Sequence, residues 1–188
     1  MNFSLSRQQQ IYLLSIARKS IENGLTDGKF LEIDVNTVEI DLQKTLSSFV
    51  TLHINHKLRG CIGSLEAHYA LVEDVARHAY AAAFDDPRFP ALRSTELENI
   101  AIDISVLGPQ LALPCISEID LLEKLEPGVD GITIKEGYKQ ATFLPSVWEQ
   151  LPDKQEFMHH LKQKAGLATN YWSDNLQIFR YHTFNFSE

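Results

Sequence analysis

The sequence predicts an α+β fold in which a mainly antiparallel sheet packs against helices. Two observations support this fold class. Stretches in which apolar and polar residues alternate occur as neighbouring pairs joined by short turns, as in β-hairpins. Stretches with helical periodicity lie between these pairs. A parallel β-α-β fold would instead need a helix after every strand. The chain of 188 residues is long enough for one domain with its own core, or for two closely joined lobes.

Three helices are expected, each with a sequence signal at its start or its end. A serine followed three residues later by glutamine forms a capping box before the first helix, and an aspartate caps the third. An Asp-Pro pair ends the second, because a residue before proline is pushed out of the helical region. The expected helices are 6–23, ended by Gly24, then 71–83, ended by Asp86-Pro87, and 154–165, ended by Gly166.

Strands are expected where apolar residues recur at every second position and turn residues follow. Two hairpins and two single strands meet this description, at 49–63, 100–107, 131–144 and 176–186. The Pro- and Glu-rich connection at about 108–128 is the expected position of a seam between lobes.

The first hairpin is expected to carry a polar face. We place its turn at 55–57, because only a three-residue loop keeps the apolar residues of both strands on one face. In that register Thr51 stands opposite Cys61, and His53 stands opposite Arg59, on the other face.

The composition limits the classes of function. A formal net charge of −8 argues against nucleic-acid binding and against attraction to an anionic membrane. The first ten residues do not resemble a signal peptide, and no apolar stretch is long enough to span a membrane. We therefore expect a cytoplasmic protein in which Cys61 and Cys115 are free thiols.

The stretch LRGCIG, residues 58–63, is the first candidate for chemistry. The thiolate is the reactive form of cysteine and is favoured by a nearby cation, which Arg59 would supply to Cys61. His53 would be a base on the same face, and the glycines would let a ligand come close. The alternative is that Cys61 packs as a small hydrophobe, as buried cysteines often do.

A second candidate is the stretch DDPRFP at 85–90. Its two aspartates suit a general acid and base or a metal, but turn chemistry alone explains them if Asp86 pairs with Arg88. Asp103 and Ser105 share one face of the strand 100–107 and are expected to face solvent.

Metal and cofactor motifs are absent from the sequence. His159 and His160 are adjacent, so they point about 100° apart on a helix and do not chelate as an i, i+4 pair does. Glycine-rich phosphate loops and the motifs H-E-x-x-H and G-x-S-x-G are also missing. We expect no metal site, and the sequence names no cofactor.

Five stretches together resemble the AMMECR domain family. They are FVTL, LRGCIG, AAAFDDPRFPAL, GVDGITI and ATFLPSVWEQLP, and the similarity runs from about Ile11 to Phe186. The resemblance implies that residues 1–188 form a single α+β domain of two lobes. It also implies a cytosolic protein, as members of this family usually are. It also implies partners: a Memo-like protein and a radical S-adenosylmethionine protein. The family positions that carry over are 58–63 and 86–89.

Three hypotheses for function stay open at this point. In the first, the protein is a modification enzyme in which Cys61 is a nucleophile or sulfur ligand and Arg59 favours the thiolate or binds an anionic group. In the second, it is a non-catalytic adaptor whose LRGCIG surface binds a small molecule or a protein. In the third, the motif is structural, and its glycines pack against the alanines of 71–83. The expected binding residues are Thr51, His53, Gly60, Gly63, Asp86 and Arg88.

Overall fold

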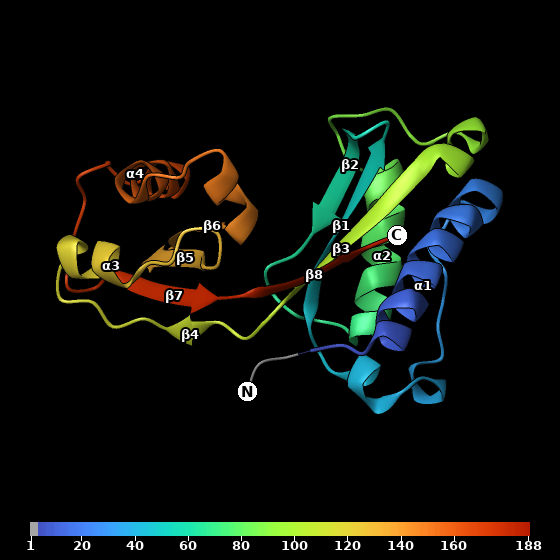
Figure 1. Cartoon of the computed structure of the whole chain (residues 1–188), viewed down its shortest axis with the longest axis horizontal. Coiled ribbons are helices and arrows are strands. Elements are labelled where there is room, and N and C mark those ends of the chain that lie inside the picture. Colours follow the sequence, from blue (N-terminus) through green and yellow to red (C-terminus); the bar gives the residue numbers. More distant parts are fainter. Residues whose placement is uncertain (1–3) are drawn as a thin grey trace. The chain divides into compact units, whose positions relative to one another are not determined.

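The computed structural model describes residues 4–188 and has an α+β fold with two antiparallel four-stranded sheets, which confirms the expected fold class (Figure 1). The chain divides into two compact units. Unit 1 contains the chain up to Leu107 together with Phe184–Glu188, and unit 2 contains Gly108–Thr183.

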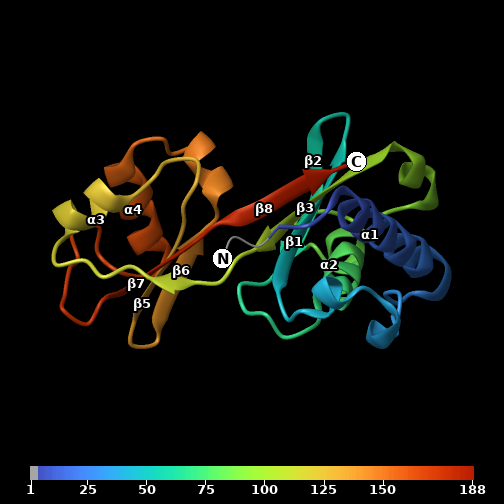
Figure 2. The same cartoon turned by 60° about the horizontal axis from the view of Figure 1, so that its bottom comes forward.

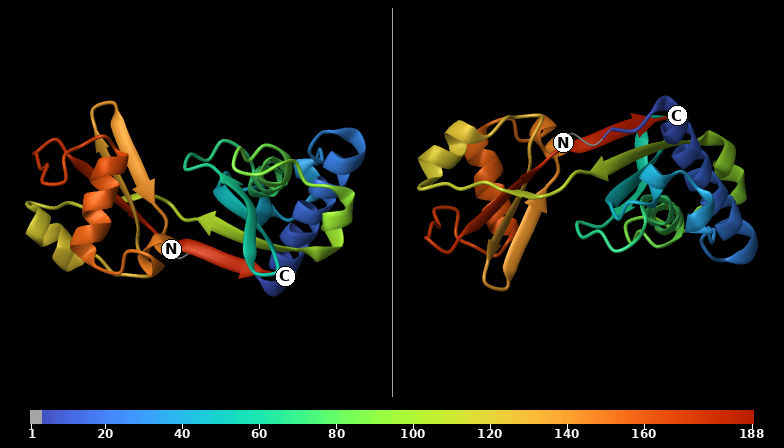
Figure 3. Two further views of the ribbon diagram at one scale, coloured as in Figure 1. Left: turned by 90° about the horizontal axis from the view of Figure 1, so that it is seen from above. Right: turned by 90° about the horizontal axis from the view of Figure 1, so that it is seen from below.

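Unit 1 is a sheet covered on one face by two helices. The strand order is β2-β1-β3-β8, so β2 lies at an edge. Helices α1 and α2 lie on the same side of this sheet (Figure 3). The elements are α1 (Arg7–Asp27), β1 (Ser47–Ile54), β2 (Lys57–Gly63), α2 (Leu71–Phe84), β3 (Ile100–Leu107) and β8 (Thr183–Ser187), with 3₁₀ turns at Val35–Thr37, Ile40–Gln43 and Ser94–Asn99.

Helix α1 begins as expected but continues past its expected end. The capping box of Ser6 and Gln9 is present. Gly24 does not stop the helix, which ends instead before Gly28, whose φ of 70° is the left-handed conformation of a C-terminal cap. A Cβ on Gly24 would lie 2.2 Å from the Phe84 ring. The absence of a side chain at Gly24 thus lets the Phe84 ring of α2 pack directly against the main chain of α1.

The β1–β2 hairpin has a shorter turn than expected and a bulge. The turn has two residues, Asn55 and His56, both with positive φ, which is the conformation of a type I′ turn. The register shifts after Leu52, so Arg59 is the extra residue of a β-bulge. The bulge restores the expected pairing of Thr51 with Cys61, but His53 pairs with Leu58, and its expected pairing with Arg59 is wrong.

The core of unit 1 lies between the sheet and the two helices. Val50 and Leu52 are fully buried in it, together with alanines of α2. Because side chains alternate along a strand, Thr51 and His53 lie on the opposite face of the sheet. The polar face predicted from the hairpin is therefore the face turned away from the helices.

Unit 2 has its own sheet and core. The strand order is β4-β7-β5-β6, and helices α3 and α4 contribute to the core with the sheet. Trp148 stacks on Phe157 with ring centroids 3.7 Å apart. The elements are β4 (Leu111–Ala112), α3 (Glu118–Lys124), β5 (Gly131–Glu136), β6 (Lys139–Phe143), a 3₁₀ turn (Pro145–Glu149), α4 (Lys154–Lys164) and β7 (Gln177–Tyr181). Strand β4 and helix α3 fall within 108–128, where the sequence suggested a connection only.

The expected final strand 176–186 is two strands in two different sheets. Strand β7 pairs with β5 of unit 2, whereas β8 lies beside β3 of unit 1 (Figure 2). Only His182 separates them. A continuous alternating pattern does not reveal that its two halves pair with different partners.

Among residues 4–188, no helix has the length and apolar character needed to cross a membrane.

Candidate functional site

The sulfur of Cys61 lies on the polar face of the unit 1 sheet. Cys61 is partly exposed and free of any disulfide. The Thr51 hydroxyl on the neighbouring strand donates a hydrogen bond to Sγ over 3.2 Å. This hydrogen bond fixes the position of the sulfur beside Thr51.

The main chain of Cys61 is held by the turn that follows α2. Its N–H donates to Oδ2 of Asp86 over 2.8 Å, and its carbonyl oxygen accepts from Nη2 of Arg88 over 3.2 Å. Strand β2 is an edge strand, so these groups would otherwise have no strand to pair with. The two side chains thus replace a neighbouring strand at this one residue.

Asp86 and Arg88 form a tight ion pair, which confirms the pairing expected from the turn. Arg88 donates to the carboxylate from Nε and Nη2, over 3.0 and 2.7 Å, and the Asp86 carboxylate is buried. The hydrogen bond from Arg88 holds the pKa of Asp86 well below its usual range, and the same bond raises the pKa of Arg88. Asp86 is therefore a charged anchor, poorly suited to take up a proton.

Arg59 is engaged by groups of its own. From the bulge, its guanidinium donates to both oxygens of Glu96, over 2.8 and 3.2 Å, and to the Pro90 carbonyl over 2.9 Å. Its hydrogen bond lowers the pKa of Glu96. Nη1 is buried and has no hydrogen-bond partner among residues 4–188. Of the two arginines in the candidate site, Arg88 is the one that contacts Cys61: its guanidinium donates to the main-chain carbonyl, and the Cys61 side chain is a smaller cause, after Asp86, of the raised pKa of Arg88.

The two glycines of the motif make room for neighbours. A Cβ on Gly60 would lie 2.0 Å from the carbonyl oxygen of Ala82, so this glycine lets β2 approach α2. A Cβ on Gly63 would lie 2.3 Å from the ring of Phe49, its partner across the hairpin. Gly60 therefore packs against an alanine of α2, as the structural hypothesis expects, whereas Gly63 packs against Phe49 of β1 and its expected contact with that helix is wrong.

His53 has a partner that the sequence did not identify. Its Nδ1 lies 2.8 Å from Oδ2 of Asp103 on β3, and Asp103 pairs directly with Thr51. Cys61, Thr51 and Asp103 thus form a row across three strands, with His53 beside it. The sequence places Asp103 on a strand face with Ser105, but its position beside His53 follows only from the pairing of β1 with β3.

The other candidates lie outside this row. His159 and His160 are 3.9 and 3.8 Å from Glu156 on α4, as helix-surface residues. Cys115 is a free thiol in unit 2 whose pKa is raised by burial. Within residues 4–188, no group of three His, Cys, Asp or Glu residues is arranged to hold a metal ion.

Comparison with known proteins gives a consistent result over the whole chain. Residues 14–186 match the family model AMMECR1. Protein MK0488 of Methanopyrus kandleri is 35% identical over 193 residues, which cover 100% of this chain and 92% of the relative. A Methanothermobacter thermautotrophicus protein is 33% identical, covering 98% and 96%. The crystal structure of uncharacterized protein PH0010 from Pyrococcus horikoshii superimposes with a TM-score of 0.87 at 30% identity, covering 99% of this chain and 94% of that one.

Proposed function

This chain belongs to the AMMECR1 family, and on that premise we propose that it is a thiol-dependent modification enzyme in which Cys61 is the nucleophile. One observation carries the proposal: in Cys61, a partly exposed residue, the sulfur accepts a hydrogen bond from Thr51 while the main chain is fixed by Asp86 and Arg88. A catalytic nucleophile needs both access and a fixed position. A cysteine that only fills space in a core needs neither.

The proposed partners are a Memo-like protein and a radical S-adenosylmethionine protein. The family resemblance supports them as members of one system. In this scheme Cys61 reacts with a small molecule or a protein group that the partners produce or consume.

The reactivity of Cys61 in the folded protein tests this proposal. A Cys115→Ser variant leaves Cys61 as the remaining thiol, and Cys61→Ser leaves Cys115. We expect iodoacetamide, followed by mass spectrometry, to modify Cys61 in the folded protein more rapidly than Cys115. If Cys61 reacts only at denaturant concentrations that unfold unit 1, the proposal is contradicted. That result would support the structural hypothesis, in which Cys61 only packs.

A binding module is the second candidate, and Leu58 favours it. Leu58 is 41% exposed at the edge strand β2, beside the bulge. Exposed apolar residues on an edge strand suit a protein partner. We expect Leu58→Glu to reduce capture of the Memo-like protein in a pull-down. The matched control is Leu111→Glu, at a 65% exposed leucine on β4 of unit 2, and equal capture by both variants contradicts a binding role for β2.

A further inference from the structure

We propose that His53, oriented by Asp103, is the acid–base partner of Cys61 in an acyl-transfer reaction on a neutral substrate. This inference rests on the proposed function, because it assigns the proton transfer that a cysteine nucleophile requires.

The register of three strands brings these groups onto one face. Thr51 pairs with Cys61 on β2 and with Asp103 on β3. The contact of Thr51 with the sulfur places Cys61 on the polar face, and the contact of His53 with Asp103 places that pair on the same face. Cys61 and Asp103 therefore lie on opposite sides of Thr51, and His53 lies two residues further along β1, in contact with Asp103.

The contact with Asp103 decides which nitrogen of His53 faces a substrate. Nδ1 lies 2.8 Å from the carboxylate, which leaves Nε2 available. A carboxylate on one nitrogen sets the tautomer and stabilises the imidazolium after it takes a proton. Both side chains are partly exposed, so a substrate reaches them from solvent.

The spacing of the strands leaves room for a small acyl group between nucleophile and base. Neighbouring strands lie about 4.8 Å apart, so Cys61 and Asp103 stand roughly 10 Å apart with Thr51 between them. A substrate carbonyl bound above Thr51 would lie between the Cys61 sulfur and the His53 imidazole. This arrangement needs no direct hydrogen bond between Cys61 and His53, because the proton leaves with the substrate's own leaving group.

The charged side chains of this face are paired with one another. Arg59 and Arg88, the arginines of the two motifs, are each paired with a carboxylate. Asp103 is likewise paired with His53. An uncharged acyl group fits this surface better than a carboxylate or a phosphate ester, because each of these cations already has an anionic partner.

The chemical step balances without a further reactant. The sulfur of Cys61 forms a bond to the carbonyl carbon, and the bond from that carbon to the leaving group breaks. The thiol proton is lost to solvent, Nε2 of the His53 imidazolium gives its proton to the leaving group, and His53 then takes up a proton from solvent. The products are an acyl-Cys61 thioester and the protonated leaving group, and His53 is regenerated.

Two esters with different leaving groups test the role of His53. In the Cys115→Ser protein, single-turnover acetylation of Cys61 is measured by mass spectrometry with phenyl acetate and with p-nitrophenyl acetate. Phenolate is a poor leaving group, so its departure is helped by a proton from an acid. p-Nitrophenolate is a good leaving group and departs without one. We expect His53→Gln to slow the phenyl acetate reaction by about tenfold or more and the p-nitrophenyl acetate reaction by less than about threefold. Asp103→Asn should act in the same direction.

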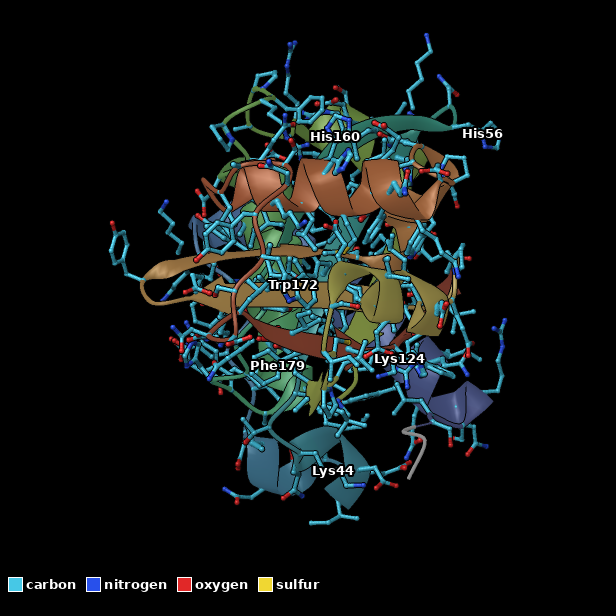
Figure 4. The ribbon with its side chains drawn as sticks, turned by 90° about the vertical axis from the view of Figure 1, so that its left-hand side faces the viewer. Lys44, His56, Lys124, His160, Trp172 and Phe179 are labelled. Atoms are coloured by element: carbon cyan, nitrogen blue, oxygen red, sulfur yellow. The ribbon has the colours of Figure 1, made fainter. Side chains whose placement is uncertain are left out.

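The matched control is His56→Gln in the same hairpin. His56 is exposed at the turn and projects away from the ribbon (Figure 4). We expect it to change neither rate. If His53→Gln slows both esters equally, or neither, the inference is overturned while the proposed function stands. If Cys61 is alkylated by iodoacetamide but acetylated by neither ester, acyl transfer is also overturned. Failure of both reagents in the folded protein overturns both proposals.

Discussion

At the scale of single residues, Thr51 is the side chain that distinguishes a presented thiol from a packed one. Its hydroxyl donates to the Cys61 sulfur, so Thr51→Val removes the donor while keeping the shape of the side chain. We expect alkylation of Cys61 at neutral pH to slow by about three- to tenfold, since such a bond contributes about 1 kcal/mol. Ser105→Ala on β3 is the control. An unchanged rate in Thr51→Val would show that the hydroxyl does not assist the reaction of the sulfur.

Asp86 makes the stability of the same region depend on pH. Arg88 holds the pKa of Asp86 below its value in the unfolded chain, about 3.9. The stabilisation is therefore fully present above about pH 4 and is lost as the pH falls towards the lower pKa of the folded state.

We expect Asp86→Asn to reduce the free energy of unfolding at pH 7, by about 1–3 kcal/mol, because Arg88 and the Cys61 N–H lose a charged acceptor. The penalty should shrink as the pH falls from 4 towards 2, because the folded protein progressively loses its advantage in keeping this carboxylate charged. Urea unfolding of both proteins across this range measures the difference. A penalty that stays constant with pH contradicts the assigned role of the Asp86 charge.

At the scale of elements, the turn of the β1–β2 hairpin holds a residue in an unfavourable conformation. His56 has a φ of 61°, which costs a non-glycine residue energy, and Asn-Gly is the preferred pair for this turn. We expect His56→Gly to stabilise unit 1 by about 0.5–1 kcal/mol, measured by denaturant unfolding. A loss of stability would show that His56 has a compensating contact.

The contact of β2 with α2 depends on Gly60. In Gly60→Ala the added carbon would meet the Ala82 carbonyl, which is main chain and moves only with the helix. We expect a loss of about 1–3 kcal/mol in unfolding free energy. Gly24→Ala is the comparison, because its added carbon meets the rings of Phe84 and Tyr80, which turn aside, and alanine favours helix. A larger loss in Gly24→Ala would contradict this account.

The ends of elements were harder to predict than their presence. The helices and hairpins follow from periodicity and capping residues, and each of those expected is present. The stop of α1 at Gly24 was wrong because a glycine inside a helix and a glycine after it look alike in sequence. The bulge at Arg59 was missed for a related reason: a two-residue turn plus a bulge gives the same pairing beyond it as a three-residue turn.

At the scale of the whole molecule, each unit has a core of its own. Both tryptophans, Trp148 and Trp172, lie in unit 2, whereas Cys61 lies in unit 1. Tryptophan fluorescence therefore reports the unfolding of unit 2, and alkylation of Cys61 reports that of unit 1.

We expect a core substitution to act mainly on the unit that contains it. Leu161→Ala removes buried contacts in unit 2 and should lower the fluorescence midpoint, at a cost of about 2–5 kcal/mol. Leu52→Ala is the matched substitution in unit 1 and should increase alkylation of Cys61 in denaturant. If each variant shifts both probes equally, the two units unfold as one cooperative system.

The sequence by itself determined the fold class, most of the elements, the family and the stretch LRGCIG, because these follow from local patterns along the chain. Tertiary structure decided the partners within the candidate site. Arg59 pairs with Glu96, 37 positions away, and the Cys61 N–H donates to Asp86, 25 positions away. Asp103 meets His53 because β3 pairs with β1. Periodicity indicates which face of a strand a residue occupies, but only the order and register of strands determine which side chains meet there.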